Sequence, residues 1–334
     1  QKLKACKTNL DFQLAFAYDF VHGILKKAAT GCEMDCSAID NTRNYTFISN
    51  HRDIVLDSAI LDVLLVDNKF KTTCEIAIGD NLLSLPWVKD LVRVNKAFIV
   101  ERALGMREML KASKRLSDYM HFAIKEKKEN IWIAQREGRA KDSDDRTQKG
   151  ILQMMSMGGE GSIAERLKQL HLVPLSISYE YDPCDFLKAR EYQLKRDVEG
   201  WKKGPTDDLV SMQTGIFGYK GHVHYHAALC LDEYLDTLDP EMSKSDIYNK
   251  VAAHIDHEIH ANYRLYPGNY VALDLLEGNT SHTDHYTPED KGKFERYVAG
   301  QLAKIDLPNK DEAYLKERIL TMYANPVRNY LAAQ

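Results

Sequence analysis

Long apolar runs are missing from this 334-residue sequence. A helix that crosses a lipid bilayer needs roughly 18–20 consecutive apolar residues, and no stretch comes near that length. The first residues also lack the basic start, apolar middle and small-residue cleavage site of a secretory signal peptide. We therefore expect a soluble or peripheral protein.

Cysteines are few and widely spaced. Such scattered cysteines in a chain of this size favour a reducing compartment. The closest two, Cys32 and Cys36, have neither the redox nor the zinc-binding spacing, so we expect ordinary thiols. The six cysteines are Cys6, Cys32, Cys36, Cys74, Cys184 and Cys230.

Neither sign of charge is in large excess. The chain has 45 basic and 49 acidic residues, which gives a formal net charge of −4. A dedicated nucleic-acid-binding protein carries a basic surplus, so this balance argues against nucleic acid as a partner. We also find no internal repeat and no low-complexity tract, which leaves an ordinary globular protein.

Short β-type runs alternate with helical patterns along most of the chain. With 44% hydrophobic residues the sequence can form a proper core, in one large domain or two modest ones. The alternation predicts an α/β fold with a mostly parallel sheet flanked by helices. The predicted strands are residues 45–48, 74–79, 97–101, 130–135, 172–180 and 222–229.

Helical patterns without strands occupy both ends of the chain. Residues 11–29 predict an amphipathic helix, followed by a connection rich in Gly, Cys, Asp and Asn. Beyond about residue 231, Tyr, Leu and Ala recur at helical spacing to the end. We therefore expect an N-terminal helical flank (1–40), an α/β domain (41–235) and a C-terminal helical region packed on it (236–334).

The most informative stretch is a predicted strand-to-helix corner at residues 45–65. A β-type run ends in Ser49-Asn50, His51 follows at once, and an apolar helical pattern begins behind it. Asp57 lies six residues after His51, so its carboxylate reaches the imidazole only if the first turn is irregular. The spacing therefore predicts a local irregularity between the two residues.

Three later segments also stand at predicted strand ends. They are A-F-I-V-E-R at residues 97–102, R-E-G-R-A-K at 136–141 and L-V-P-L-S-I at 172–177. The carboxyl ends of parallel strands meet at one edge of a sheet, where α/β proteins place their sites. We expect these segments to gather at the same edge as His51.

In this order, the four segments resemble the glycerophospholipid acyltransferases. That family carries a His-x4-Asp block, a phenylalanine-rich strand ending in arginine, a Glu-Gly-x-Arg block and a Val-Pro strand. The resemblance covers about residues 45–230, and A-I-G-D-N-L at 77–82 adds to it. Asp57 stands one residue later than the family's aspartate, and Arg139 one residue earlier than its arginine. We match Asp57 rather than Asp53 because the apolar run that follows then aligns.

The resemblance implies a role for each matched residue. His51 would take the proton of the attacking hydroxyl, and Asp57 would orient its ring, as in a serine-hydrolase triad with the substrate hydroxyl in place of serine. Backbone amides near the corner or a basic side chain would stabilise the oxyanion. The residues matched to the acceptor site are Arg102 and Arg139 for its phosphate, Glu137 and Gly138 for the pocket wall, and Val173 and Pro174 for the floor.

The implied reaction moves a fatty acyl group from acyl-CoA or acyl-carrier protein to glycerol 3-phosphate or 1-acylglycerol 3-phosphate, without cofactor or metal. Since the substrates are partly membrane-borne, we expect a membrane surface as a partner and a cytoplasmic, peripheral location on its inner face. Residues 103–128 have the composition of a basic amphipathic helix, although ordinary packing on the sheet explains the same pattern.

Two other functions stay open. One is an O-acyltransferase for a non-phosphate lipid with an amino-acid head group, and the other is a non-catalytic lipid-binding module on the same scaffold. For the remaining polar clusters we expect structural or surface roles, because none has a zinc-binding spacing and charged loops are usually solvated. These clusters are Asp142, Asp144 and Asp145; His222, His224 and His226; and His254, His257 and His260.

Overall fold

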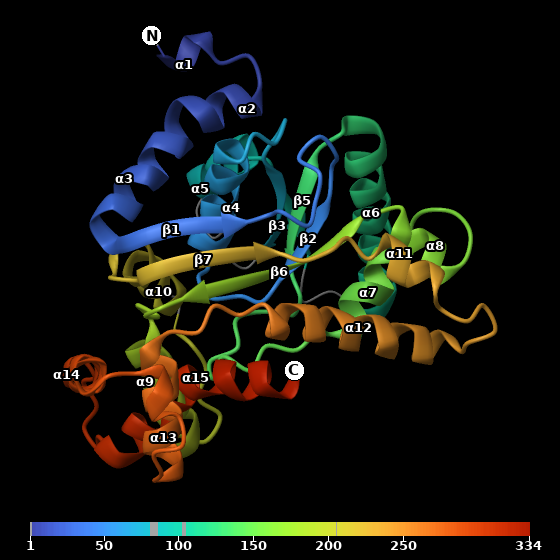
Figure 1. Cartoon of the computed structure of the whole chain (residues 1–334). Coiled ribbons are helices and arrows are strands. Elements are labelled where there is room, and N and C mark those ends of the chain that lie inside the picture. The colour runs from blue at the N-terminus through green and yellow to red at the C-terminus, as the bar shows by residue number, and fades with distance from the viewer. Residues whose placement is uncertain (1, 81–85, 102–104, 205) are drawn as a thin grey trace.

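A seven-stranded sheet forms the centre of the computed structural model, which describes residues 2–80, 86–101, 105–204 and 206–334 (Figure 1). The strand order is β1-β7-β6-β2-β5-β3-β4. The run β6-β2-β5-β3-β4 is parallel, β7 is antiparallel to β6, and β1 is parallel to β7. The predicted α/β fold with a mostly parallel sheet is confirmed. The strands are β1 (Ala29–Asp35), β2 (Thr46–Ser49), β3 (Cys74–Gly79), β4 (Ala97–Val100), β5 (Asn130–Ala134), β6 (Leu172–Tyr179) and β7 (Gly221–Ala227).

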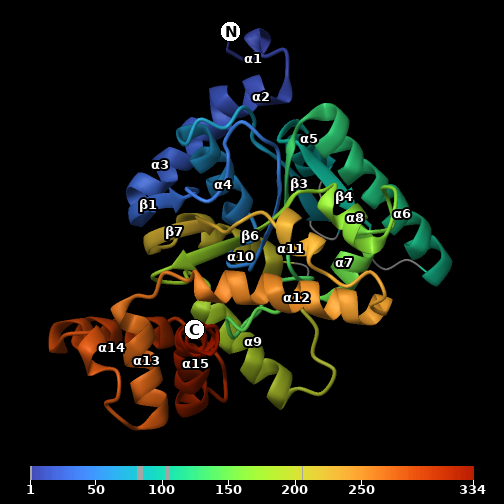
Figure 2. The ribbon, with the colours of Figure 1, turned by 45° about the vertical axis from the view of Figure 1, so that its right-hand side comes forward.

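The central strands are apolar because helices cover both faces of the sheet (Figures 1 and 2). Successive side chains alternate between two cores: in β2, Phe47 faces one and Ile48 the other, and both are fully buried. The first core includes side chains of α3 (Tyr18–Ala28) and α4 (Leu56–Asp67). The second includes side chains of α6 (Met106–Phe122), η3 (Ala123–Lys127), α7 (Lys149–Met155), α8 (Ile163–Lys168), α11 (Asp232–Asp236) and α12 (Lys244–Ala261).

The N-terminal segment contains a strand where the sequence predicts a connection. Residues 29–35 form β1, an edge strand beside β7, and the prediction was wrong there. Its sequence, A-T-G-C-E-M-D, lacks apolar alternation because the strand is only half-buried. The predicted helix of residues 11–29 is present, in three consecutive pieces. They are α2 (Asn9–Phe12), the π-helix η1 (Gln13–Ala17) and α3, preceded by the single turn α1 (Lys2–Ala5).

The charged segment predicted as an amphipathic helix forms α6 and η3. Its second half packs under the sheet through Met120 and Ile124. Its first half is exposed to solvent, including Met106 at 85% and Leu110 at 57%. One end of this segment therefore packs as core, and the other leaves apolar and basic side chains uncovered.

The C-terminal helices form a third core of their own beside the sheet (Figures 1 and 2). Phe294, Ile319 and Tyr323 are buried in it, together with Tyr181 and Ala189 from the segment that follows β6. In the described chain, no helix has the length and apolarity needed to cross a membrane. The remaining helices are α5 (Pro86–Val94), α9 (Asp185–Asp197), α10 (Asp207–Phe217), α13 (Pro267–Glu277), η4 (Thr283–His285), α14 (Pro288–Ala303) and α15 (Glu312–Ala332).

Candidate active site

The corner after β2 is irregular, as the sequence spacing predicts. Residues 50–53 have no regular structure, and α4 begins only at Leu56. Asn50 fixes the corner to the neighbouring strand: its side-chain oxygen accepts from the Ile177 N–H (2.8 Å) and its amide donates to the Ile177 carbonyl (2.9 Å). The chain leaves the sheet at this point and reverses direction before the helix starts.

This irregular turn brings His51 and Asp57 into contact. His51 Nδ1 lies 2.8 Å from Asp57 Oδ2. A carboxylate can only accept, so Nδ1 carries the proton and Nε2 of the neutral ring keeps its lone pair. The backbone N–H groups of Arg52 (2.6 Å) and Asp53 (3.0 Å) donate to the same carboxylate oxygen. Asp57 is thus fully buried and held from several sides.

The outer nitrogen of the His51 ring is open. The ring packs edge-on against Trp132, with centroids 5.5 Å apart, and 13% of the side chain is exposed. Within the described chain, Nε2 has no hydrogen-bond partner. The arrangement is that of an oriented base, because one ring nitrogen is fixed by a carboxylate while the other faces outward.

Two tyrosines complete the surroundings of Asp57. Tyr179 donates from its hydroxyl to Asp57 Oδ1 (3.3 Å), and Tyr225 donates to the Asp57 backbone carbonyl (3.0 Å). Burial raises the pKa of both hydroxyls well above the usual value, so they stay donors. Sequence reasoning missed both. The available signal for Tyr179 was its place at the end of β6, the strand in which the Val-Pro pair was singled out.

Asp53, which we did not match to the family's aspartate, makes different contacts from Asp57. Its Oδ1 accepts from the N–H groups of Val55 (2.9 Å) and Leu56 (2.8 Å), so it fixes the turn that leads into α4. Burial and the neighbouring Asp57 raise its pKa. Gly215 of α10 faces it, and a Cβ at that position would overlap the Asp53 carboxylate.

The third predicted segment follows β5, next to β2 in the sheet. Glu137 donates its N–H to the Gln148 side chain (2.8 Å), and Gly138 has φ +68°, with open space where a Cβ would be. Arg139 is half-buried, and its Nη1 is fully buried without a hydrogen bond to any described residue. Its charge acts on Asp53 and Asp182, on which it exerts a pKa-lowering effect. A buried guanidinium nitrogen without a partner is suited to an anionic ligand.

The other two predicted segments fare differently. Arg102 lies outside the described residues. Val173 and Pro174 are buried inside the sheet, beside Phe47 and Ile48 of β2. Val173 has no exposed surface in this structure, and its assignment to the floor of a pocket stays a prediction. The part of β6 that reaches the His51 corner is its carboxyl end, Ile177 to Tyr179, because the site forms where the strands end.

One aspartate of the charged loop is not solvated, which corrects the sequence interpretation. Asp145 is fully buried and accepts from Arg52 Nη2 at 2.7 Å. Asp142 and Asp144 lie nearer the surface, where Asp144 pairs with Arg146. Nothing in a run of three nearby aspartates distinguishes the buried one, because its partner stands far away in the sequence.

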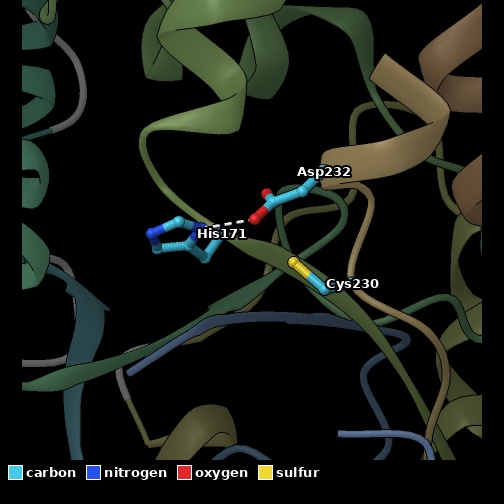
Figure 3. A group of neighbouring side chains, drawn as sticks. All are labelled: His171, Cys230 and Asp232. Atoms are coloured by element: carbon cyan, nitrogen blue, oxygen red, sulfur yellow. Dashed lines mark hydrogen bonds and ion pairs between the residues drawn. The ribbon is translucent and has the colours of Figure 1, made fainter. Parts of the chain in front are cut away.

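Among the described residues, one cluster has the side chains to hold a metal ion: His171, Cys230 and Asp232 (Figure 3). It lies at the amino end of β6, opposite the His51 edge. His171 Nδ1 is 2.7 Å from Asp232 Oδ2, and Arg43 Nη2 donates to the same oxygen at 3.1 Å. Burial raises the pKa of the Cys230 thiol to about 12. Arg43 thus already places a positive charge beside two of these side chains.

The two histidine groups singled out in the sequence lie elsewhere. His222, His224 and His226 share one face of β7, as predicted, and lie near Glu33 and Asp35 of β1. In α12, His254 stacks on Tyr234, while His260 is buried and donates from Nε2 to the Asp145 carbonyl (3.1 Å). Burial lowers the pKa of His260 to about 4, so its ring is neutral.

Comparison with known proteins finds a family model that matches part of the chain. Residues 34–178 match the family model described as Acyltransferase, and this range contains the His51 corner and the β5–α7 loop. No curated protein matches the sequence. Among solved structures, the chain is similar to the 1-acyl-sn-glycerophosphate (LPA) acyltransferase PlsC from Thermotoga maritima, with 12% identity over 76% of this chain and 83% of that chain and a TM-score of 0.42. Residues 34–178 are therefore similar to the acyltransferase family, and the match covers less than half of the chain.

Proposed function

We propose that the protein is an O-acyltransferase that moves a fatty acyl group from an acyl thioester to the hydroxyl of glycerol 3-phosphate or 1-acylglycerol 3-phosphate. The observation that carries this proposal is the His51–Asp57 pair, with Nδ1 bonded to the carboxylate and Nε2 open. The acyl donor is acyl-CoA or an acyl-carrier protein, and the chemistry uses no cofactor.

The proposed reaction begins when His51 Nε2 takes the proton of the acceptor hydroxyl. The oxygen attacks the thioester carbonyl, a tetrahedral intermediate forms, and its collapse expels the thiolate, which the imidazolium protonates. Asp57 holds the ring in the required tautomer and stabilises the imidazolium. No protein nucleophile is needed, because the acceptor hydroxyl itself takes that role.

The acceptor phosphate is assigned to Arg139. A guanidinium forms paired hydrogen bonds with phosphate oxygens, and the buried Nη1 of Arg139 has none within the described structure. Arg139 follows β5, which is the direct neighbour of β2, so its loop lies beside the corner that carries His51. The positive φ of Gly138 sets the turn that leads into it. Arg102 is the second phosphate ligand that we propose.

The exposed first half of α6 is the proposed contact with a membrane surface. Met106, Met109 and Leu110 are exposed there, and the basic residues Arg107 and Lys111 beside them are exposed too. Apolar side chains enter the interface while basic ones meet anionic head groups. Because β4 is parallel to β2, the start of α6 lies toward the sheet edge that carries His51. We propose a peripheral location on the inner face of the membrane.

The test is a radiolabelled acyl-transfer assay with glycerol 3-phosphate, 1-acylglycerol 3-phosphate and an amino-acid-headed lipid as acceptors. The expected result is transfer to a phosphate acceptor by the native protein and its loss in His51→Ala. Equal product in both proteins would mean that His51 is not the base. Transfer to the amino-acid-headed lipid alone would replace the phosphate assignment, and no transfer at all would favour a lipid-binding module.

A further inference from the structure

A buried ion pair joins the His51 corner to the β5–α7 loop (residues 135–148). Arg52 Nη2 donates to Asp145 Oδ2 across 2.7 Å, and the two side chains are 7% and 0% exposed. Removing both charges from water is costly, and apolar residues of similar volume are often more stable in such a place. A gain in folding stability therefore explains the presence of this pair poorly. A role in holding its two segments at a fixed distance from each other explains it better.

The arginine end of the pair is tied to the proposed base. Arg52 directly follows His51, and its backbone N–H donates to Asp57 Oδ2 at 2.6 Å. The same oxygen lies 2.8 Å from His51 Nδ1. The backbone of Arg52 is thus fixed by the carboxylate that orients the imidazole, while its guanidinium reaches into the neighbouring loop.

The aspartate end is tied to the proposed phosphate ligand. Asp145 Oδ1 accepts from the N–H of Ala140 at 3.3 Å, and Ala140 directly follows Arg139. The Asp145 carbonyl accepts from His260 Nε2 of α12 at 3.1 Å. One carboxylate therefore holds the His51 corner with one oxygen and the backbone beside Arg139 with the other.

We propose that Asp145, through its ion pair with Arg52, is a positioning residue that fixes the distance between the proton-accepting nitrogen of His51 and the phosphate-binding guanidinium of Arg139. This inference rests on the proposed function. Asp145 touches neither substrate, and its effect is that an acceptor bound by its phosphate presents its hydroxyl to Nε2. Without the pair, the loop would hold Arg139 over a wider range of positions.

The experiment compares two variants with a matched control. Asp145→Asn keeps the side-chain shape and removes the charge, whereas Arg52→Met with Asp145→Leu removes the pair without leaving a buried charge behind. Arg146→Ala is the control in the same loop, because it breaks the exposed Arg146–Asp144 pair and a hydrogen bond to Asn329 of α15 but leaves Arg52 and Asp145 in place. Circular dichroism and thermal unfolding establish that each protein is folded.

The expected kinetic result is a split between constants. In the apolar double variant, KM for the phosphate acceptor rises about tenfold or more, which is the effect of losing one well-placed interaction. Asp145→Asn gives a smaller rise in the same direction. KM for the acyl donor changes little, and the control stays close to native. A folded double variant with native KM for the acceptor, or an equal rise for the donor, would overturn the proposal.

Hydrogen–deuterium exchange separates this proposal from the proposed function. In both variants, amides of residues 136–145 are expected to exchange faster, while those of β2 and β5 keep their native protection. If the native protein transfers no acyl group to a phosphate acceptor, the proposed function fails, and this measurement still decides whether the pair positions the loop. Unchanged exchange in the loop of both variants would overturn the positioning role.

Discussion

Two histidine–aspartate pairs lie at opposite ends of the parallel strands, and the distances within them are almost the same. The Nδ1 to Oδ2 distance is 2.8 Å between His51 and Asp57 and 2.7 Å between His171 and Asp232. His51 follows the carboxyl end of β2, and His171 precedes the amino end of β6, its parallel neighbour. Distance alone therefore does not tell the proposed catalytic pair from the other one.

The surroundings of the two carboxylates differ. Asp57 is fully buried and accepts backbone N–H groups and a tyrosine hydroxyl, so among these partners the imidazole is the one that can carry a positive charge. Asp232 accepts from Arg43, whose Nη2 is also 3.2 Å from His171 Nδ1. A guanidinium beside the carboxylate offsets the negative charge that would stabilise an imidazolium. The comparison teaches that the other partners of the carboxylate set how well it can stabilise a protonated histidine.

Removing each histidine is the most direct way to break the comparison. His51→Ala is expected to lower kcat by roughly 10³-fold, within the range for loss of a general base, while His171→Ala changes kcat less than about threefold. Initial-rate kinetics with saturating donor measure both. A large loss in His171→Ala with native folding would place chemistry at the second edge and contradict the comparison.

The carboxylates give a slightly smaller contrast. Asp57→Asn is expected to lower kcat by roughly 10²-fold or more, because an amide no longer stabilises the charged imidazole or selects its tautomer. Asp232→Asn is expected to leave kcat within about threefold of native. The same kinetic assay applies, and equal effects at the two positions would show that the different surroundings do not matter.

The arginines sharpen the comparison at the level of binding. Arg139→Ala is expected to raise KM for a phosphate acceptor about 10–100-fold, the loss of a charge-assisted hydrogen bond, with little change in KM for the donor. Arg43→Ala, which removes the cation beside the His171 pair, is expected to leave both constants near native. An unchanged acceptor KM in Arg139→Ala would remove Arg139 from the phosphate site.

A third buried carboxylate, Asp185, extends the comparison to stability. It accepts from the hydroxyls of Tyr297 and Tyr323, and burial raises its pKa to about 7. The folded state therefore binds a proton more tightly than the unfolded chain, in which an aspartate titrates near ~4. Its stabilising contribution is full below that pH and is lost as the pH rises toward 7.

Asp185→Asn should remove this dependence. Urea unfolding at a series of pH values measures it, and we expect the slope between about pH 4 and 7 to become shallower by on the order of 1 kcal/mol per pH unit. Asp62, whose pKa burial also raises to about 7, titrates in both proteins, so the difference between them isolates Asp185. Identical slopes would mean that Asp185 is ionised throughout the range.

The sequence predicted the features that depend on local pattern. Apolar runs and helical periodicity were enough for the α/β class and for the irregular corner, because the offset between His51 and Asp57 is incompatible with a regular helix. The placement of the segment after β5 beside β2 followed from the general rule that parallel strands end together.

What the sequence could not show depends on partners far along the chain. Asp145 is buried in an ion pair with Arg52, which stands 93 residues away in the sequence. No local pattern marks such a pair. The Val-Pro motif likewise does not encode the strand register that sets Val173 beside Phe47. β1 was missed for a different reason, because a half-exposed edge strand needs few apolar residues and leaves no clear pattern in the sequence.

The position of β1 also bears on how the chain folds during its synthesis. Its sheet neighbour, β7, begins at residue 221, whereas β1 ends at Asp35. While the ribosome makes the intervening residues, β2, β3, β4, β5 and β6 can already pair, but β1 must wait with its backbone groups unpaired. Closing so long a loop makes this contact late and slow. The nascent protein is therefore expected to expose one sheet edge until most of the chain has emerged.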